Sequence, residues 1–293
     1  MRQLVLVLGA HGQLGDAMTS RLVPRHEVIA RSRDELDVTV PDAVRATVGS
    51  ICPDVIVNCA AYTSVDEAQH EPIRALDTNA WAVHTLARAA ADIDATLVHF
   101  STDFVFDGAA DQPYDETATP NPRGTYAVSK LVGEWMAADA PRHYVLRVES
   151  LFGGRLARSS IDRLYEGIVA GRPVKAFADR TVSPSYVYDV VAATARLLAN
   201  PPAPGLYHCV NSGWTTWAHL ARELARLVGT PDAPILEIPL ADAHLPTPRP
   251  KFAALSNARL AQAGMVMPTW QDALARYVKQ KTEDQSEGPV QSE

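Results

Sequence analysis

A tyrosine and a lysine stand four residues apart in the stretch TYAVSKLVGE, residues 125–134. Residues at this spacing lie one turn apart on one face of a helix, so Lys130 is expected next to the phenol of Tyr126. A positive charge there favours the phenolate and lowers the tyrosine pKa from its usual value of about 10. The pair therefore predicts that Tyr126 is a proton donor tuned by Lys130. The same spacing is common on solvated helix faces, so the interpretation depends on partners elsewhere.

Two hydroxyl side chains are candidate partners. The stretch HFSTDFVFDG, residues 99–108, follows an apolar run and places Ser101 and Thr102 at the carboxyl end of a predicted strand. Ligands bind at this end of the strands in open α/β sheets. A hydroxyl there can donate a hydrogen bond to a substrate carbonyl and polarise it.

A glycine-rich turn near the N-terminus has the features of a phosphate-binding loop. LVLGAHGQLG places Gly9, Gly12 and Gly15 after a strand-like run and at the start of a helix-like one. Glycine lets the backbone approach a pyrophosphate, and the exposed amides and the helix dipole hold its charge. His11 lies inside this loop and either touches a cofactor or fills the turn. The alternative is a tight turn without a ligand.

The end of the second predicted strand indicates which dinucleotide is used. The sequence there is IARSRDEL, with Arg31, Ser32 and Arg33 where an acidic residue would hold the ribose hydroxyls of NADH. Two arginines suit a 2′-phosphate, so we expect NADPH, with NADH as the alternative. The third predicted strand ends in the small residues Ala60 and Ala61, which leave room for a cofactor.

These candidate residues require a scaffold that brings strand ends together. Apolar runs alternate with helical patterns through the first 150 residues, which predicts a Rossmann-type, doubly wound parallel sheet of the α/β class. We expect a dinucleotide-binding domain over residues 1–150, a smaller α/β substrate domain over 151–280 and a disordered polar tail over 281–293. The expected strands are 3–9, 26–30, 54–60, 95–102 and 143–148, and the expected helices are 12–23, 41–51, 71–92 and 125–138.

Composition limits the classes of function. The 293 residues carry a net charge of −7, which argues against a nucleic-acid surface. The three cysteines, Cys52, Cys59 and Cys209, form no CxxC pair, so free thiols are expected. The nine histidines show no metal-ligand spacing, and we predict no metal. No apolar run of about 20 residues could span a membrane, so we expect a cytoplasmic protein that acts on a small molecule.

Together these motifs resemble the extended short-chain dehydrogenase/reductase superfamily, and within it the dTDP-4-dehydrorhamnose reductases. GQLG, AAYTSVDEAQ and STDFVFDG carry the resemblance, and DRTVSPSYVYDV and PTPRPKFAALSNARL extend it through the C-terminal half. The resemblance implies that NADPH delivers hydride to C4 of a dTDP-linked 4-keto-6-deoxy sugar. Tyr126 would protonate the new alkoxide, Thr102 would orient the carbonyl, and Lys130 would hold the nicotinamide ribose.

The resemblance also implies further contacts, a homodimer, and a return of residues 172–200 to the first domain. It adds Gln13, Leu14, Asp37, Val38, Tyr62 and Asn79 to the cofactor site, and Asp103, Val105, Phe106 and Ser150 to the substrate site. Arg249 lies in the Pro-rich stretch 238–251, which reads as an ordered loop. A guanidinium there suits a diphosphate by bidentate hydrogen bonds, and a surface salt bridge is the alternative.

One segment departs from the reductase pattern. RVESLFGG, residues 147–154, has Ser150 where the reductases carry a tryptophan beside the sugar, so the identity of the sugar stays open. Two other functions use the same scaffold. One is a sugar-nucleotide epimerase or dehydratase that keeps NAD bound. The other is a non-catalytic regulatory subunit, like the β-subunit of methionine adenosyltransferase, and the intact set of Thr102, Tyr126 and Lys130 argues against it.

Overall fold

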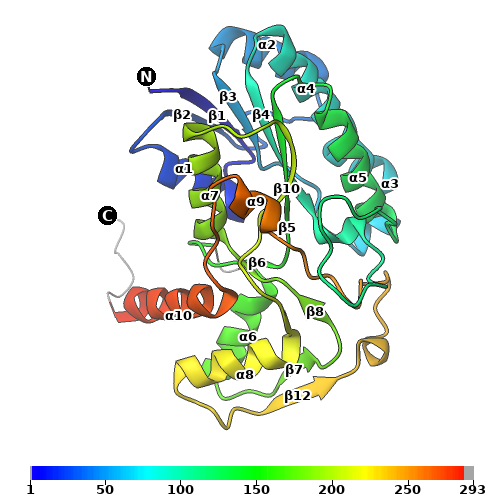
Figure 1. The fold of residues 1–293 in the computed structure, drawn as a ribbon, viewed down its shortest axis with the longest axis vertical. Coiled ribbons are helices and arrows are strands. Elements are labelled where there is room, and N and C mark those ends of the chain that lie inside the picture. Colours follow the sequence, from blue (N-terminus) through cyan, green and yellow to red (C-terminus); the bar gives the residue numbers. More distant parts are fainter. Residues whose placement is uncertain (1, 157, 287–293) are drawn as a thin grey trace.

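The computed structural model describes residues 2–156 and 158–286. Its centre is a sheet of six parallel strands in the order β10-β5-β4-β3-β1-β2 (Figure 1). The apolar runs form these strands because both faces of the sheet are covered: in β1, Val5 and Val7 face one core and Leu6 and Leu8 the other. The strands are β1 (Leu4–Leu8), β2 (Glu27–Arg31), β3 (Val55–Asn58), β4 (Thr96–Thr102), β5 (His143–Val148) and β10 (Gly205–His208).

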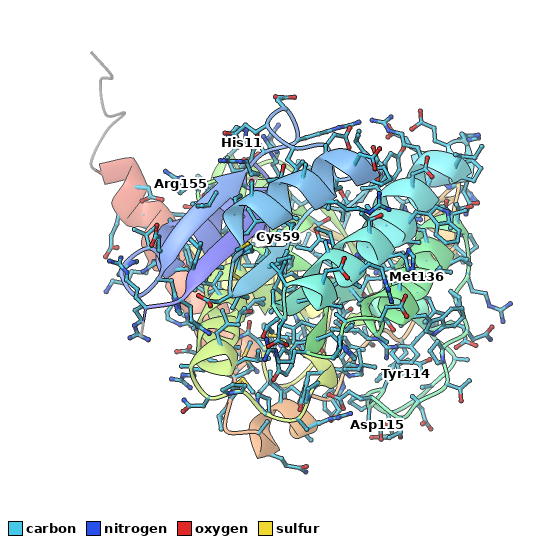
Figure 2. The ribbon with its side chains drawn as sticks, turned by 90° about the horizontal axis from the view of Figure 1, so that it is seen from above. His11, Cys59, Tyr114, Asp115, Met136 and Arg155 are labelled. Carbon is cyan, nitrogen blue, oxygen red and sulfur yellow. The ribbon has the colours of Figure 1, made fainter. Side chains whose placement is uncertain are left out.

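Helices cover both faces of this sheet, which confirms the predicted doubly wound α/β class. One face packs against α1 (Gln13–Leu22) and α7 (Val187–Ala199). The other packs against α2 (Pro41–Ile51), α4 (Ala82–Asp92) and α5 (Thr125–Ala137). Seen from above, the last three lie side by side from blue to green, with Met136 labelled on α5 (Figure 2).

The long helix predicted over residues 71–92 is interrupted. Helix α3 (Pro72–Leu76) is followed by a π-helical turn, η2 (Asp77–Trp81), and only then by α4. The carbonyl of Asn79 in this turn lies so close to α5 that a Cβ on Gly133 would overlap it. Helical periodicity does not reveal this, because a single π-turn keeps the chain helical.

A second, smaller lobe lies at the lower end of the view in Figure 1 and has its own apolar core. Its short strands pair as β7 with β12, β8 with β11, and β6 with β9. The lobe contains α6 (Ser160–Val169), α8 (Trp217–Val228), α10 (Trp270–Ser286), β6 (Leu151–Phe152), β7 (Val174–Phe177), β8 (Thr181–Val182), β9 (Ser185–Tyr186), β11 (Thr215–Thr216) and β12 (Ile235–Ile238). Short elements complete the chain: η1 (Glu67–Gln69), η3 (Asp103–Val105), η4 (Leu240–Ala243) and α9 (Ala258–Gln262).

The chain passes between the lobes several times. Within the range 172–200, which was expected to return to the first lobe, α7 does pack on the large sheet, whereas β7 pairs with β12 in the second lobe. The strand that completes the large sheet is β10, which begins at Gly205, after the range 172–200, and was not expected. The chain thus passes between the two lobes more often than predicted. The division into a cofactor domain and a substrate domain remains our proposal.

The C-terminal prediction needs a correction. Helix α10 continues to Ser286, so the first six residues of the expected disordered tail are helical, and 287–293 lie outside the described residues. The helix persists because Lys281 reaches the buried Asp162 at 3.5 Å and Lys279 pairs with Glu283 one turn on. Within the described part of the chain, no helix is both long enough and apolar enough to cross a bilayer.

Candidate active site

The glycine loop closes tightly at the end of β1. Gly9 has φ +72°, and a Cβ there would lie 2.7 Å from the backbone nitrogen of Ala60. A Cβ on Gly15 would overlap the carbonyl oxygen of Gly9, so α1 can begin only with glycine at this position. The backbone at this turn is thus free of side chains, as a bound pyrophosphate requires.

A pocket of about 270 Å³ opens beside this loop. It brings together most of the expected cofactor residues, together with four that the sequence analysis missed: Leu36, Thr39, Cys59 and Thr78. The expected residues that line it are Gly9, His11, Gly12, Arg33, Asp37, Val38, Ala60, Ala61 and Tyr62.

Five expected cofactor residues are used differently. The amide of Gln13 donates to the carbonyl of Gly153 at 2.9 Å, and Leu14 is buried in the core. Arg31 donates to its neighbouring carbonyl, and the backbone nitrogen of Ser32 donates to Glu35; neither residue is in the lining. The amide of Asn79 is fully engaged: it holds both backbone groups of residue 62 and donates to the hydroxyl of residue 129, so it shapes the loop.

The pocket fits NADP on its own geometry. The backbone cradle at Gly9 and Gly15 leaves room where side chains would lie. Arg33 in the lining supplies a cation, and its Nε lies 3.5 Å from a carboxylate oxygen of Asp37. That side chain is exposed, so an anion can compete for it. The lining also contains the small residues Ala60 and Ala61, which leave room for a flat ring.

The three candidate catalytic residues meet at the carboxyl edge of the sheet. Thr102 ends β4, and Tyr126 and Lys130 lie in the first turns of α5; all three are buried. Burial, opposed by a hydrogen bond with Thr102 and helped by the charge of Asp103, raises the pKa of Tyr126 to about 12. A phenol with a high pKa keeps its proton until a strong base such as an alkoxide forms beside it.

Lys130 does not lower the pKa of Tyr126 as predicted. Its Nζ donates to the carbonyl of Phe100 at 2.6 Å and lies 3.4 Å from Nε2 of His99. Burial lowers the lysine pKa to about 8. The pKa of Tyr126 is raised, not lowered, so the expectation that the ammonium favours the phenolate is wrong for this structure. Helical spacing placed both residues correctly but could not show which acceptor the long lysine side chain would reach.

Ser101, the other hydroxyl at the end of β4, points away from the site. Its Oγ donates to Glu134 at 2.5 Å, and Glu134 also accepts two hydrogen bonds from Arg147. This buried ion pair links β4, α5 and β5 beneath the catalytic residues. The sequence held a signal for this difference: successive side chains of a strand point to opposite faces, so Ser101 and Thr102 could not both face the site.

The residues expected to bind the substrate lie in different surroundings. Val105 and Phe106 are buried in a small core cluster, so they are core residues and not the substrate contacts that were expected. Asp103 is buried beside Thr102, whereas Ser150 is partly accessible and has φ +45°. Arg249 pairs with Asp66 at 2.8 Å, so the salt bridge that was the alternative to a diphosphate contact is present.

A second pocket, of about 310 Å³, opens in the smaller lobe and was not foreseen. It presents three cations, Arg163, Lys175 and Arg180, beside the aromatic rings of Phe177 and Trp217. The indole nitrogen of Trp217 is buried and has no hydrogen-bond partner among the described residues. Cations and aromatic rings around one cavity suit a nucleoside diphosphate. The residues come from four separate segments, which is why no motif reveals them.

Known proteins match the whole arrangement. The RmlD substrate binding domain family matches residues 1–283. A dTDP-4-dehydrorhamnose reductase of Mycolicibacterium smegmatis is 34% identical over 100% of this chain and 90% of its own length. A probable dTDP-4,6-dihydroxy-2-methyloxan-3-one 4-ketoreductase of Streptomyces antibioticus is 35% identical over 92% of each chain.

Solved structures agree with these matches. The dTDP-4-dehydrorhamnose reductase of Bacillus anthracis, in complex with NADP, superposes with a TM-score of 0.91 and 28% identity over 96% of this chain and 100% of that one. A UDP-glucose 4-epimerase of Thermus thermophilus, with a TM-score of 0.80 and 21% identity over 98% and 100%, shares the fold alone. The chain belongs to the RmlD substrate binding domain family, the family of the dTDP-4-dehydrorhamnose reductases.

Proposed function

We propose that this protein reduces the C4 keto group of a dTDP-linked 4-keto-6-deoxy sugar with NADPH. The observation that carries the proposal is the meeting of Thr102, which ends β4, with Tyr126 at the start of α5. The glycine-loop pocket supports it, because Cys59, Ala60 and Ala61 in its lining follow the neighbouring strand β3 at the same edge of the sheet. Two relatives are named for ketone reduction on a dTDP-sugar, and a similar structure holds NADP.

Each residue has a role that follows from its position. NADPH supplies a hydride when it is bound. The amides at Gly9, Gly12 and Gly15 would hold its pyrophosphate, and Arg33 its 2′-phosphate. Thr102 would turn its hydroxyl proton from Asp103 to the substrate carbonyl, and Tyr126 would give its phenol proton to the new alkoxide oxygen. Lys130 would hold a ribose hydroxyl after leaving the carbonyl of residue 100.

The second pocket supports binding of the dTDP portion. Neither Arg163 nor Lys175 forms an ion pair within residues 2–156 and 158–286, so both cations are available to a diphosphate. The unpartnered indole nitrogen of Trp217 can donate a hydrogen bond to an oxygen of the ligand. We assign the diphosphate and base to this pocket, in place of Arg249.

The homodimer and the cytoplasmic location remain predictions. The outward face of α5 supports a homodimer, because it presents Val128, Val132 and Trp135 and no charged side chain. Trp135 is 62% exposed. Light scattering on wild-type protein and Trp135→Glu would test this, with a monomer expected for the variant.

The decisive experiment is NADPH oxidation with dTDP-4-dehydro-L-rhamnose. Wild type should oxidise NADPH, and Tyr126→Phe should lose at least about a hundredfold in kcat while binding NADPH normally. The matched control is Tyr207→Phe, which removes a buried hydroxyl that donates to Ala203 far from the site. Unchanged turnover in Tyr126→Phe would refute the assignment, and NADPH binding without oxidation in wild type would favour the regulatory alternative.

A further inference from the structure

Two buried carboxyl groups lie side by side next to the catalytic residues. Thr102 and Val148 are register partners at the ends of β4 and β5. Asp103 and Glu149 are the residues that directly follow these two strands, so both lie at the edge of the sheet where ligands bind. Asp103 is 2% exposed and Glu149 is 1% exposed.

Each carboxyl uses one oxygen and leaves the other unpartnered. Oδ1 of Asp103 accepts a hydrogen bond from the hydroxyl of Thr102 at 3.0 Å. Oε2 of Glu149 accepts from the backbone nitrogen of Ser183 at 2.6 Å. Oδ2 of Asp103 and Oε1 of Glu149 are buried and have no partner within the described residues. A buried, ionised carboxylate needs several donors, so a proton on one of these oxygens stabilises the pair.

The surrounding charges balance only one carboxylate. Arg180 is the buried cation whose charge acts on both carboxyls, and its Nε donates to the carbonyl of Pro250. The adjacent Arg249 is already paired with Asp66. Burial raises the pKa of Asp103 to about 6. Burial and the charge of Asp103 hold the pKa of Glu149 well above its usual value.

A chain of hydroxyl groups connects this pair to the proton donor. Tyr126 is hydrogen-bonded to Thr102, and Thr102 to Asp103. Building on the function proposed above, we propose that Asp103 and Glu149 share one proton and that this proton resupplies Tyr126 through Thr102 after each turnover.

The transfers balance without any further reactant except water. When the phenol O–H of Tyr126 breaks, its proton bonds to the alkoxide oxygen of the product. Glu149 passes the shared proton to Asp103 through a water molecule or a side-chain rotation. The phenolate then takes the proton of the Thr102 hydroxyl, and the Thr102 oxygen takes the shared proton from Asp103. A proton from water finally restores the pair, and no electrons enter or leave it.

Glu149→Gln is the sharpest variant, because glutamine keeps the shape and the acceptor for Ser183 but cannot pass on a proton. The matched control is Glu116→Gln. Glu116 is a half-buried glutamate, away from the site, that also accepts from a backbone nitrogen, that of His208, at 2.8 Å. Both proteins are assayed for the pH dependence of kcat, KM, NADPH affinity and the solvent isotope effect.

We expect wild-type kcat to fall as the pH rises through the pKa of Glu149. In Glu149→Gln this limb should disappear, and kcat at neutral pH should fall about tenfold with KM and NADPH affinity unchanged. The solvent isotope effect should increase, because proton resupply becomes limiting. Glu116→Gln should keep the wild-type profile. A wild-type pH profile in Glu149→Gln would overturn the proposal.

A measurement on wild type alone covers the case in which the variant does not fold. Carbon-13 NMR of glutamate-labelled holoenzyme should show one carboxyl that stays protonated at neutral pH. If all glutamates titrate in the ordinary range, the shared proton is refuted. If wild type does not oxidise NADPH, the proposed function fails, whereas the NMR titration still decides whether the proton is shared.

Discussion

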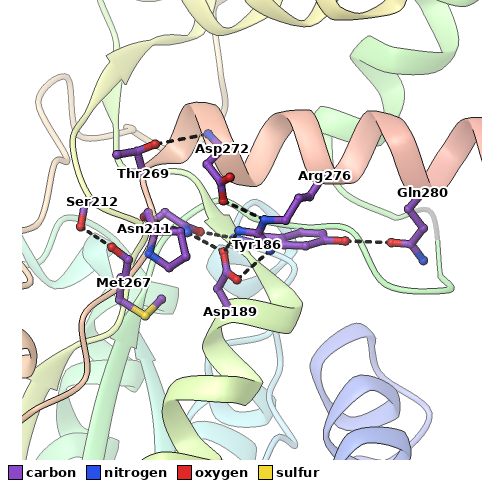
Figure 3. A network of polar contacts seen from close by, with 10 residues as sticks. Tyr186, Asp189, Asn211, Ser212, Met267, Thr269, Asp272, Arg276 and Gln280 are labelled. Carbon is purple, nitrogen blue, oxygen red and sulfur yellow. Dashed lines mark hydrogen bonds and ion pairs between the residues drawn. The ribbon is translucent and has the colours of Figure 1, made fainter.

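An ion pair between α7 and α10 joins the two lobes, and its contribution to stability can be predicted. Arg276 donates two hydrogen bonds to Asp189, at 2.9 and 2.7 Å (Figure 3). Asp189 is buried and also accepts from Asn211, whereas the Arg276 side chain is 38% exposed. The guanidinium also lies over the ring of Tyr186. Arg276→Met keeps most of the stem and removes the charge.

The expected loss follows from burial. Removing one partner of a fully buried ion pair costs about 3–5 kcal/mol. Water screens the exposed third of Arg276, and Asn211 still donates to the remaining carboxylate, so we expect a loss of about 2 kcal/mol in the free energy of unfolding. The control is Arg226→Met, which breaks an equally bidentate pair with Glu223 on the surface of α8. That change should cost less than about 0.5 kcal/mol.

Urea denaturation of both variants, followed by fluorescence, measures the difference. A double-mutant cycle with Asp189→Asn should give a coupling energy of about 1–2 kcal/mol. If Arg276→Met loses no more stability than Arg226→Met, the reasoning from burial is refuted. If the loss is large but the coupling is near zero, the stabilisation comes from the contact with Tyr186 instead.

Three further outcomes test the site. Gly15→Ala should abolish NADPH binding measured by calorimetry, because its Cβ overlaps the carbonyl of Gly9, and retained affinity would contradict the loop geometry. Arg33→Asp should reverse the preference for NADPH over NADH by at least about tenfold in kcat/KM, and an unchanged ratio would exclude Arg33 from 2′-phosphate recognition. Folding raises the pKa of Glu149 above its ordinary value of 4.5. Between that value and the raised pKa the folded protein binds more protons than the unfolded chain, so wild-type stability should fall as the pH rises through this range. The Tm of Glu149→Gln should depend less on pH than that of wild type and should be higher at neutral pH. If the two plots of Tm against pH run parallel, this prediction is refuted.

Features set by local chemistry were predictable from the sequence. The glycines of the phosphate loop, the apolar strands and the four-residue spacing of Tyr126 and Lys130 each follow from backbone geometry within one element. The boundaries of α5 and β5 agree closely with expectation, because strong periodic patterns define them. Family resemblance then supplied the order of these pieces along the chain.

Features that depend on tertiary contact were not predictable. The acceptor of Lys130 is a carbonyl on β4, and nothing near residue 130 in the sequence indicates it. Arg249 finds Asp66 nearly two hundred residues earlier in the chain. The raised pKa of Tyr126 arises from burial, which reverses the effect expected from a neighbouring lysine. Pairing and desolvation are properties of the folded chain, and sequence spacing contains neither.

The sixth strand of the large sheet has a consequence for how such a protein can be divided or recombined. Strand β10 and helix α7 are contributed after the chain has already entered the smaller lobe, and α10 returns to that lobe after α9 has packed on the large sheet. A fragment ending near residue 150 would lack an edge strand, and only α1 would remain to cover one apolar face of the sheet. Protease cleavage there should not release a stable half. A single genetic crossover likewise cannot transplant the substrate lobe, so we expect new substrate specificity in this fold to arise through substitutions of individual residues that line the site.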